Sequence, residues 1–186
     1  MSDSQISKLE NPIRIAELDP KNTLIKSGLK ENMILCDIGA GTGIFSFPAT
    51  QISSNDIYAL EINDSMIELL KSRTNMQKIP NLKILKINSS TFPLENGICD
   101  MVIMVTVLHE IENKELMLYE IKRVLKEKGK LLIIEFNKRE TPMGPPIDNR
   151  ISEEYVKEIC INNGFKTIDK IILGDNFYSL VFESVI

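Results

Sequence analysis

Apolar runs alternate with amphipathic segments along most of the chain, a pattern typical of strands that alternate with helices. The run 100–107 (DMVIMVTV) is almost entirely apolar, as expected for a central parallel strand that is covered on both faces. The segment 113–126 instead gathers its apolar residues on one side of a helix. The alternation predicts strands at 33–37, 57–61, 82–87, 100–107 and 131–136. It predicts helices at 20–27, 44–53 and 113–126, and one more helix that carries Met66, Ile67, Leu69 and Leu70.

Polar residues and glycines mark where several of these helices begin and end. Asp19 followed by Pro20 is a typical helix start, and Gly28 is a typical stop. Asn63 or Asp64 can cap the helix after the second strand. Gly129 is predicted to follow the end of the helix at 113–126.

The pattern changes after residue 136. The stretch 141–146 (TPMGPP) is predicted to be a loop, because its prolines fit neither a helix interior nor an inner strand. A helix then begins at Ser152 and stops at Asn163-Gly164. The apolar stretches 165–173 and 177–182 are separated by three residues, so they are expected to form an antiparallel hairpin.

Together these elements predict a doubly wound α/β sheet with one antiparallel strand near an edge. The length of 186 residues fits a single domain with a full core. We expect residues 1–30 to form an N-terminal segment with a short helix, and residues 31–186 to form the core. The net charge of −4 and the isoelectric point of about 5.2 make a nucleic-acid partner unlikely, since such a partner needs a basic face.

The cysteines and the N-terminal residues indicate a reducing compartment. Cys36, Cys99 and Cys160 lack close spacing and are interpreted as reduced core thiols. The first ten residues (MSDSQISKLE) have no apolar core of a leader, and no run reaches the roughly 18 apolar residues of a membrane span. A cytoplasmic protein without a membrane partner is therefore expected. No metal is expected either, because no ligand cluster has the spacing of a metal site.

The strongest chemical signal is the glycine-rich stretch Gly39-x-Gly41-x-Gly43 after the first strand. Glycines at the carboxyl end of such a strand let a ligand approach the backbone closely. A dinucleotide-binding loop would place its third glycine at the position of Ile44. Asp37 would repel a pyrophosphate but suits an ammonium group. The motif therefore favours an amino-acid-bearing nucleoside over NAD.

Two further strand ends carry polar residues that suit a nucleoside. Glu61 ends the second strand, where a carboxylate can accept the hydroxyls of an unphosphorylated ribose. The alternative for Glu61 is a surface carboxylate near a helix start. Asn88-Ser89-Ser90 follow the third strand and can bind an adenine edge or simply form a turn.

Four stretches together resemble a class I S-adenosylmethionine-dependent methyltransferase of the group that includes the ubiquinone/menaquinone-biosynthesis and arsenite enzymes: DIGAGTGIF, YALEIND, KINSSTFPLENGICDMVIMVTVLHEI and KGKLLIIEF. The resemblance covers about residues 12–186. It implies a Rossmann-like sheet of seven strands in the order 3-2-1-4-5-7-6, with strand 7 antiparallel. It also implies cofactor contacts at Asp37, Gly39, Gly41 and Gly43 for the methionine part, Glu61 and Ile62 for ribose and adenine, Asn88 and Ser89 for adenine, and Thr106 near the sulfonium. Relatives usually carry Asp where Asn88 stands, which puts the orientation of the adenine contact in doubt.

His109, the only histidine, is the candidate general base. It follows the fourth strand, on the side where the ligand is expected. The alternatives are a substrate contact, a residue that lines the cofactor site or caps the next helix, and a structural residue remote from the site. Glu135, Lys138 and the loop 141–146 follow the fifth strand and are candidates for a substrate wall. Arg14, in the N-terminal segment, can bind an anionic substrate or lie at the surface.

The sequence therefore predicts methyl transfer from S-adenosylmethionine to a small molecule, mainly by in-line positioning, with S-adenosylhomocysteine as the product. A protein or RNA acceptor stays open, as does a module that binds the cofactor without turnover. An NAD-dependent oxidoreductase is disfavoured by Ile44, Asp37 and the closing hairpin. The identity of the acceptor and the oligomeric state are not encoded in any motif.

Overall fold

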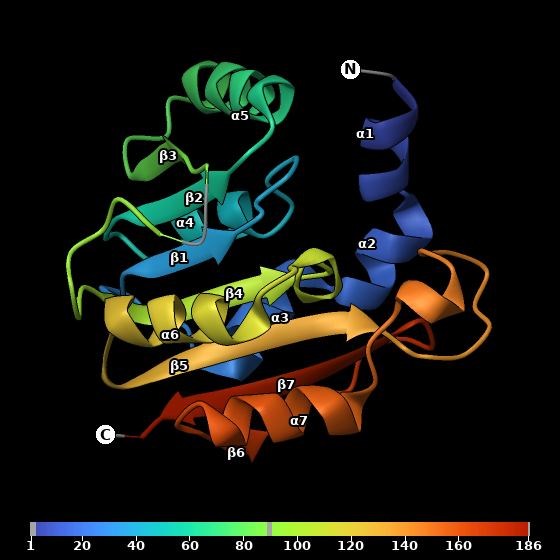
Figure 1. Cartoon of the computed structure of the whole chain (residues 1–186). Coiled ribbons are helices and arrows are strands. Elements are labelled where there is room, and N and C mark those ends of the chain that lie inside the picture. Colours follow the sequence, from blue (N-terminus) through green and yellow to red (C-terminus); the bar gives the residue numbers. More distant parts are fainter. Residues whose placement is uncertain (1–2, 89–90, 186) are drawn as a thin grey trace.

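The computed structural model describes residues 3–88 and 91–185, and its centre is one seven-stranded sheet (Figure 1). The strand order is β3-β2-β1-β4-β5-β7-β6, with β7 antiparallel to both of its neighbours and every other neighbouring pair parallel. The predicted order and the antiparallel last strand are therefore confirmed. The strands are β1 (Leu35–Ile38), β2 (Ile57–Glu61), β3 (Leu82–Lys86), β4 (Cys99–Val105), β5 (Leu125–Phe136), β6 (Phe165–Asp169) and β7 (Phe177–Ser184).

Helices cover both faces of the sheet, and two short helices lie across the end to which the parallel strands point (Figure 1). Helices α3, α4 and α5 share one hydrophobic core with the sheet, and α6 and α7 share the other. The helices are α1 (Asp3–Leu9), α2 (Pro12–Leu18), α3 (Pro20–Ser27), α4 (Ser46–Ile52), α5 (Asp64–Gln77), α6 (Lys114–Val124) and α7 (Glu153–Asn162), with 3₁₀ turns η1 (Leu108–Glu110) and η2 (Ile147–Asn149).

The central strands are apolar throughout because successive side chains enter different cores. In β4, Met101 and Ile103 belong to the core under α3 to α5, while Val102 and Met104 belong to the core under α6 and α7. Side chains along a strand alternate between the two faces of the sheet, so a strand covered on both faces needs apolar residues at every position. This explains why the run 100–107 shows no alternation of its own.

Several predicted helix ends are confirmed by their capping contacts. Asn63 accepts hydrogen bonds from the backbone N–H groups of Ser65 and Met66, and Ser152 accepts one from Tyr155. Gly28 ends α3 with a φ of 100°, a conformation that favours glycine. Asp19 stands before α3, but its side chain binds the side-chain amide of Asn22 instead of a backbone N–H.

Two predicted boundaries were wrong. Helix α6 ends at Val124, and β5 begins at Leu125, so Gly129 lies inside β5 and is not a helix stop. The pairing with β4 moves from Cys99–Leu125 to Met101–Lys130, which leaves a bulge of extra residues in β5. A strand can thus begin before its apolar run when a bulge absorbs the polar residues.

The second wrong boundary is in the closing hairpin. Strand β6 ends at Asp169, so residues 170–176 link it to β7 in place of the predicted three-residue link. The hydroxyl of Ser179 accepts from the N–H of Ile171 and donates to its carbonyl oxygen. The apolar residues after Asp169 are therefore held by a side chain and do not extend the strand.

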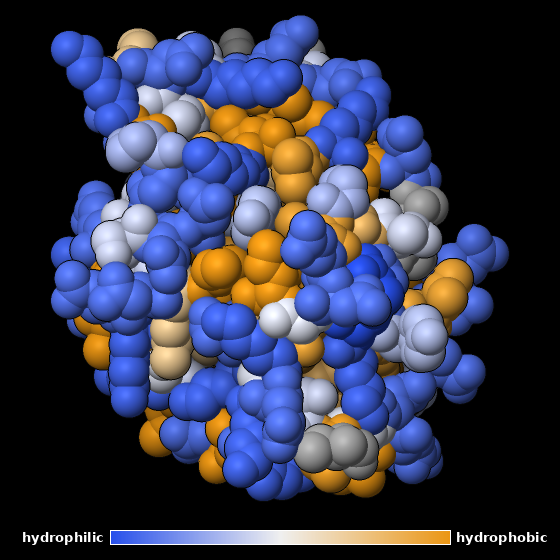
Figure 2. All heavy atoms as spheres, turned by 90° about the vertical axis from the view of Figure 1, so that its left-hand side faces the viewer, coloured by the Kyte–Doolittle hydropathy of each residue, from blue (hydrophilic) through white to orange (hydrophobic). Residues whose placement is uncertain are grey.

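The surface at the amino ends of the parallel strands is mixed in polarity (Figure 2). Figure 2 shows the side at their amino ends, where hydrophilic side chains surround separate hydrophobic areas. Within residues 3–88 and 91–185, no helix is both long and apolar enough to cross a membrane. The polar residues singled out in the sequence gather at the opposite, carboxyl ends of the strands.

Candidate active site

A cavity of about 660 Å³ lies at the carboxyl ends of β1, β2 and β4. The strand order reverses between β1 and β4, and ligands of open α/β sheets bind at such a point. The N-terminal segment closes one side of the cavity through Gln5, Lys8 and Leu9 of α1 and Arg14 of α2. The cavity, referred to below as the cofactor cavity, thus combines strand ends with the first helices of the chain.

The glycine loop forms part of the wall of the cofactor cavity with its backbone. Gly39, Gly41 and Gly43 all have positive φ values, of 70°, 56° and 86°. A Cβ on Gly39 or Gly43 would collide with neighbouring side chains at 2.5 Å. A Cβ on Gly41 would meet only the tip of Leu9, at 3.4 Å, and the carbonyl of Gly39. The backbone at Gly41 therefore offers a surface that a ligand can approach closely.

Asp37 lies under this loop and lines the cofactor cavity. Its carboxylate is buried and accepts a hydrogen bond of 2.5 Å from the hydroxyl of Ser46. Burial raises the pKa of Asp37 to about 7, and the charge of Glu61 adds to the rise, while the hydrogen bonds from Ser46 oppose it. A cationic group beside Asp37 would stabilise its charged form.

Glu61 connects the second strand to the glycine loop. One carboxylate oxygen accepts from the N–H of Gly41 at 2.8 Å, and the other accepts from the N–H groups of Ile62 and Asn63 at 2.8 and 2.9 Å. A carboxylate has about four acceptor positions. Three of them are filled by backbone, so the geometry leaves room for one further donor at the oxygen that contacts Gly41.

The remaining predicted cofactor contacts are not equally placed. Ile62 and Thr106 line the cofactor cavity, and 64% of Ile62 is exposed. Asn88 is exposed, and its neighbour Ile87 is the residue of this segment that lines the cavity. Ser89 lies outside the described residues, so its adenine contact stays a prediction, as does that of Asn88.

His109, in η1, and Glu135, near the end of β5, form a buried pair. The Nδ1 atom of His109 lies 2.7 Å from one oxygen of Glu135, and the backbone N–H of His109 donates to the other at 3.1 Å. Both side chains are buried. Both oxygens of Glu135 are thus engaged by His109, so this carboxylate orients the imidazole, and its role in a substrate wall stays a prediction.

The pair shapes both the orientation and the basicity of the imidazole. With Nδ1 donating to Glu135, the other ring nitrogen, Nε2, is the free acceptor. Burial lowers the pKa of His109, but the hydrogen bond and the charge of Glu135, with a smaller contribution from Glu110, outweigh burial and the charge of Lys114, so the pKa is raised above its usual value.

A second cavity of about 630 Å³ adjoins His109, and we call it the lateral cavity. It is lined by His109 and Lys138 and also by Lys114, Tyr155 and Arg150. Glu110 lines both the lateral and the cofactor cavities, so the two are neighbours. The predicted catalytic and substrate residues are therefore divided, with Arg14 in the cofactor cavity and His109 and Lys138 in the lateral one.

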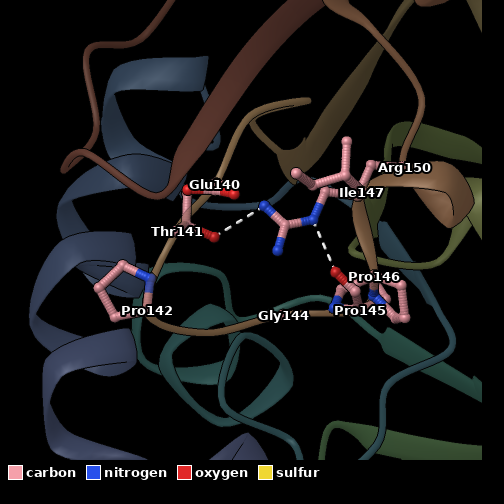
Figure 3. Close-up of a pocket in the computed structure, with 8 residues that line it drawn as sticks. All are labelled: Glu140, Thr141, Pro142, Gly144, Pro145, Pro146, Ile147 and Arg150. Carbon is pink, nitrogen blue, oxygen red and sulfur yellow. Dashed lines mark hydrogen bonds between the residues drawn. The ribbon is translucent and has the colours of Figure 1, made fainter.

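Arg150 holds the loop between β5 and α7 in place (Figure 3). The sequence alone did not predict this role for Arg150. Its buried guanidinium donates to the hydroxyl of Thr141 at 2.7 Å and to four main-chain carbonyls, those of Asn137, Arg139, Met143 and Pro145, at 2.8 to 3.1 Å. It also lies 5.4 Å from the ring centroid of Phe136. The predicted loop 141–146 is therefore wrapped around one side chain.

A second unpredicted contact fixes α1 over the cofactor cavity. Arg73 of α5 forms an ion pair with Glu10, which follows α1, and donates to the carbonyl of Thr42 in the glycine loop. Glu10, Thr42 and Arg73 are far apart in the sequence, so no local pattern indicates that they meet. The side chains of Lys8 and Leu9 reach the cavity because of this docking.

The fold and the site together define an α/β protein whose two carboxylates and glycine backbone suit a nucleoside with an amino-acid end. The comparisons with known proteins agree. The methyltransferase domain family matches residues 29–183. A ubiquinone/menaquinone biosynthesis C-methyltransferase UbiE of Francisella tularensis subsp. novicida is 29% identical over 138 residues, which are 73% of this chain and 54% of that enzyme. The chain therefore belongs to the class I S-adenosylmethionine-dependent methyltransferases.

Solved structures show the same fold in proteins of more than one activity. A SAM-dependent methyltransferase from Aquifex aeolicus superposes over the whole of both chains with a TM-score of 0.91 and 28% identity. The cyclase SpnF has the same fold, with a TM-score of 0.77 over 89% of this chain and 80% of that one, at 16% identity. This chain spans about half the length of the UbiE relatives it matches.

Proposed function

We propose that the protein transfers a methyl group from S-adenosylmethionine to a small-molecule acceptor. The observation that carries the proposal is the meeting of two buried carboxylates, Asp37 and Glu61, with the glycine backbone in one cavity. This set of groups fits the cofactor, since a carboxylate suits the ammonium of its methionine end and another suits a ribose hydroxyl. The open backbone at Gly41 leaves room for the part of the cofactor that joins its ammonium group to its ribose.

Each wall of the cofactor cavity has a role in this proposal. Asp37 holds the ammonium, and Glu61 accepts one ribose hydroxyl at its remaining acceptor position. Ile62 covers a face of the adenine, because an exposed aliphatic side chain beside a cavity gains from being covered. Asn88 and Ser89 bind the adenine edge, and Thr106 lies beside the sulfonium.

When bound, S-adenosylmethionine supplies an already activated methyl group. The protein then needs mainly to hold the acceptor in line, and orientation alone can contribute roughly 7–11 kcal/mol. His109 adds a base for an acceptor that must lose a proton, which contributes a factor of about 10²–10⁴. In this proposal the Nε2 atom of His109 takes up the proton, and the molecule that receives the methyl group lies in the lateral cavity.

Binding of adenosyl ligands tests the proposal directly. At 100 times its dissociation constant, S-adenosylhomocysteine is expected to raise the free energy of unfolding by about 2.7 kcal/mol, measured by thermal denaturation. NAD at the same concentration is expected to have no effect. Stabilisation by NAD alone would contradict the proposal. Transfer of labelled methyl from the cofactor into size-fractionated cell extract then separates small acceptors from protein or RNA, and a protein that binds but transfers to no fraction is a binding module.

The His109–Glu135 pair makes a prediction that needs no acceptor. The chain has one histidine, so its ring signals in NMR spectra need no assignment. The pKa of His109 is expected to lie above 6.5 in the wild-type protein and to fall in Glu135→Gln, where burial remains but the neighbouring charge is removed. Since the folded-state pKa is raised, protonation of His109 stabilises the fold below about pH 6.5, and this contribution disappears as the pH rises through the folded-state value.

Glu110→Gln is the matched control for this titration. Glu110 lies 3.7 Å from Nε2 of His109, but its side chain is 73% exposed, so its charge is screened by water. We expect this variant to lower the pKa of His109 less than Glu135→Gln does. An equal effect of both variants would show that Glu135 has no special role in holding the imidazole.

A further inference from the structure

The side chain of Glu110 belongs to both cavities of the candidate active site. Glu110 lies in η1, a few residues past the end of β4. It lines the cofactor cavity together with Thr106, and it lines the lateral cavity together with His109. Within residues 3–88 and 91–185, it is the one residue that lines both. A group that passes from a ligand in one cavity to a ligand in the other therefore crosses the boundary at which Glu110 stands.

No fixed cation neutralises the carboxylate of Glu110. Its Oε1 atom lies 3.7 Å from Nε2 of His109, and its side chain is 73% exposed. In the described part of the chain, no lysine or arginine forms an ion pair with it, whereas Glu120 pairs with Arg123. The negative charge of Glu110 is thus available to a positive charge that arrives in either cavity.

Carboxylates outnumber cations around the cofactor cavity. Among the described residues that line it, four are acidic and two are basic: Asp37, Glu61, Glu110 and Glu112 against Lys8 and Arg14. Such an excess of one sign favours a ligand with a net charge of the opposite sign. S-adenosylmethionine carries a sulfonium in addition to its ammonium and carboxylate, and is a net cation. S-adenosylhomocysteine lacks the sulfonium charge and is neutral overall.

Methyl transfer in the proposed function moves this positive charge past Glu110. The bond between the methyl carbon and sulfur breaks, and its electron pair stays on sulfur. The acceptor atom forms the new bond to carbon and loses its proton to Nε2 of His109. The sulfonium becomes a neutral thioether and the imidazole becomes an imidazolium. Glu110 borders the cavity in which the charge starts and lies 3.7 Å from the atom on which it ends.

We propose that Glu110 makes the cofactor cavity select the cationic cofactor over its neutral product. The inference rests on the proposed function and deepens it, since it assigns the control of product release to one residue. Before transfer the carboxylate attracts the sulfonium. After transfer it is paired with the imidazolium of His109, and the thioether has no charge by which Glu110 can hold it.

The ratio of two dissociation constants tests the inference without a known acceptor. S-adenosylmethionine and S-adenosylhomocysteine differ only in the methyl group and its positive charge, and calorimetry measures the affinity of each. Because an exposed ion pair is weak and gains strength when a ligand excludes water, Glu110→Gln is expected to weaken S-adenosylmethionine by about three- to tenfold. The affinity for S-adenosylhomocysteine should stay the same. An unchanged ratio of the two affinities in Glu110→Gln would overturn the inference.

Glu115→Gln is the matched control for the loss of charge. Glu115 is exposed in the first turn of α6 and lines neither cavity, so its replacement removes the same charge nearby but outside the site. This variant should keep the wild-type ratio. A change of the ratio as large as in Glu110→Gln would show that the overall charge of the protein sets the preference, and would overturn the role of Glu110.

A third ligand separates the charge from the methyl group. Sinefungin has the skeleton of the cofactor with an ammonium-bearing carbon in place of the methylated sulfur. Glu110→Gln is expected to weaken sinefungin as it weakens S-adenosylmethionine, because both are cationic at this position. A loss confined to S-adenosylmethionine would indicate a contact with the methyl group and would overturn the inference.

The wild-type protein alone gives a test if Glu110→Gln does not fold. Added salt screens charges, so it is expected to weaken S-adenosylmethionine more than S-adenosylhomocysteine. An equal response of the two ligands to salt would overturn the inference. Failure of both ligands to bind at any salt concentration would contradict the proposed function itself, whereas binding of both with an unchanged ratio in Glu110→Gln contradicts the inference alone.

Discussion

Glu61→Gln is expected to weaken the binding of S-adenosylhomocysteine by about 100-fold. Glu61 accepts three backbone N–H groups and has one acceptor position left for the ligand. A glutamine of the same shape places an NH₂ group where a carboxylate oxygen stood, so it would face either Gly41 or the Ile62–Asn63 amides donor to donor. Hydrogen bonds to a charged group contribute roughly 1.5–3 kcal/mol each, and 1.4 kcal/mol is a factor of ten.

Calorimetric titration measures this loss, and Glu68→Gln is the matched control. Glu68 lies on α5, is exposed, and differs from Glu61 in having no part in the cofactor cavity. The control should bind S-adenosylhomocysteine like the wild-type protein. Glu61→Gln should also lower the melting temperature, because the glycine loop loses its acceptor. Binding of Glu61→Gln within threefold of the wild-type value would show that the assignment of Glu61 to the ribose is wrong.

The affinity for the cofactor is expected to fall tenfold for each pH unit below about 7. The reason is that Asp37 is half protonated near pH 7 in the ligand-free protein, whereas an ammonium group binds its charged form. Below this pH a proton must leave before the ammonium can be held, and the affinity changes accordingly with pH. Calorimetry in buffers of different ionisation enthalpy should detect the released proton.

Variants of Asp37 and Ser46 separate this effect from general acid sensitivity. Asp37→Asn should bind more weakly at pH 8 and lose the slope between pH 6 and 7. Ser46→Ala removes the hydrogen bond that lowers the pKa of Asp37, so the slope should extend to higher pH. Asp56→Asn, whose side chain pairs with Lys83 at the amino end of β2, should keep the wild-type slope. An unchanged slope in Asp37→Asn would contradict the role of Asp37.

The folded-state pKa of Asp37 also carries a cost in stability. The value is raised above that of an unfolded chain, so the ligand-free protein loses stability as the pH rises from about 4 to about 7. Asp37→Asn is therefore expected to be more stable than the wild-type protein at pH 8 in the absence of ligand. The charge of Asp37 thus lowers the stability of the ligand-free protein and is expected to be stabilised when a cationic ligand binds. This combination is consistent with a binding role.

The sequence was sufficient for the parts of the site that depend on strand ends. The rule that parallel strands end at one edge of the sheet brought Asp37, the glycine loop and Glu61 into one cavity, and the resemblance added Thr106. The same rule placed His109 and Glu135 on the ligand side, but it could not show that they bind each other. Pairing of side chains from different elements depends on their rotamers and on the docking of the elements, which have no local sequence pattern.

The wrong strand boundaries and the unpredicted arginine contacts also depend on residues that are far apart in the sequence or in other elements. The start of β5 and the end of β6 follow from partners in other strands, and the propensity of their own residues does not fix them. The contacts of Arg73 and Arg150 join segments that the sequence treats separately. An arginine is common at protein surfaces, so nothing at either position predicts burial.

The loop around Arg150 is held in large part through its main chain. Four of the five oxygens that Arg150 binds are main-chain carbonyls, and every amino acid supplies one. Within residues 137–149, the side chains of Asn137, Arg139 and Thr141 also bind main-chain carbonyls, and Gly144 has no room for a Cβ, so the exchangeable positions are those without such contacts. Pro145, Asp148 and Asn149 in this stretch line the lateral cavity. Evolution or a protein engineer could therefore alter the wall of the lateral cavity at these positions, while Arg150 keeps holding the main chain of the loop.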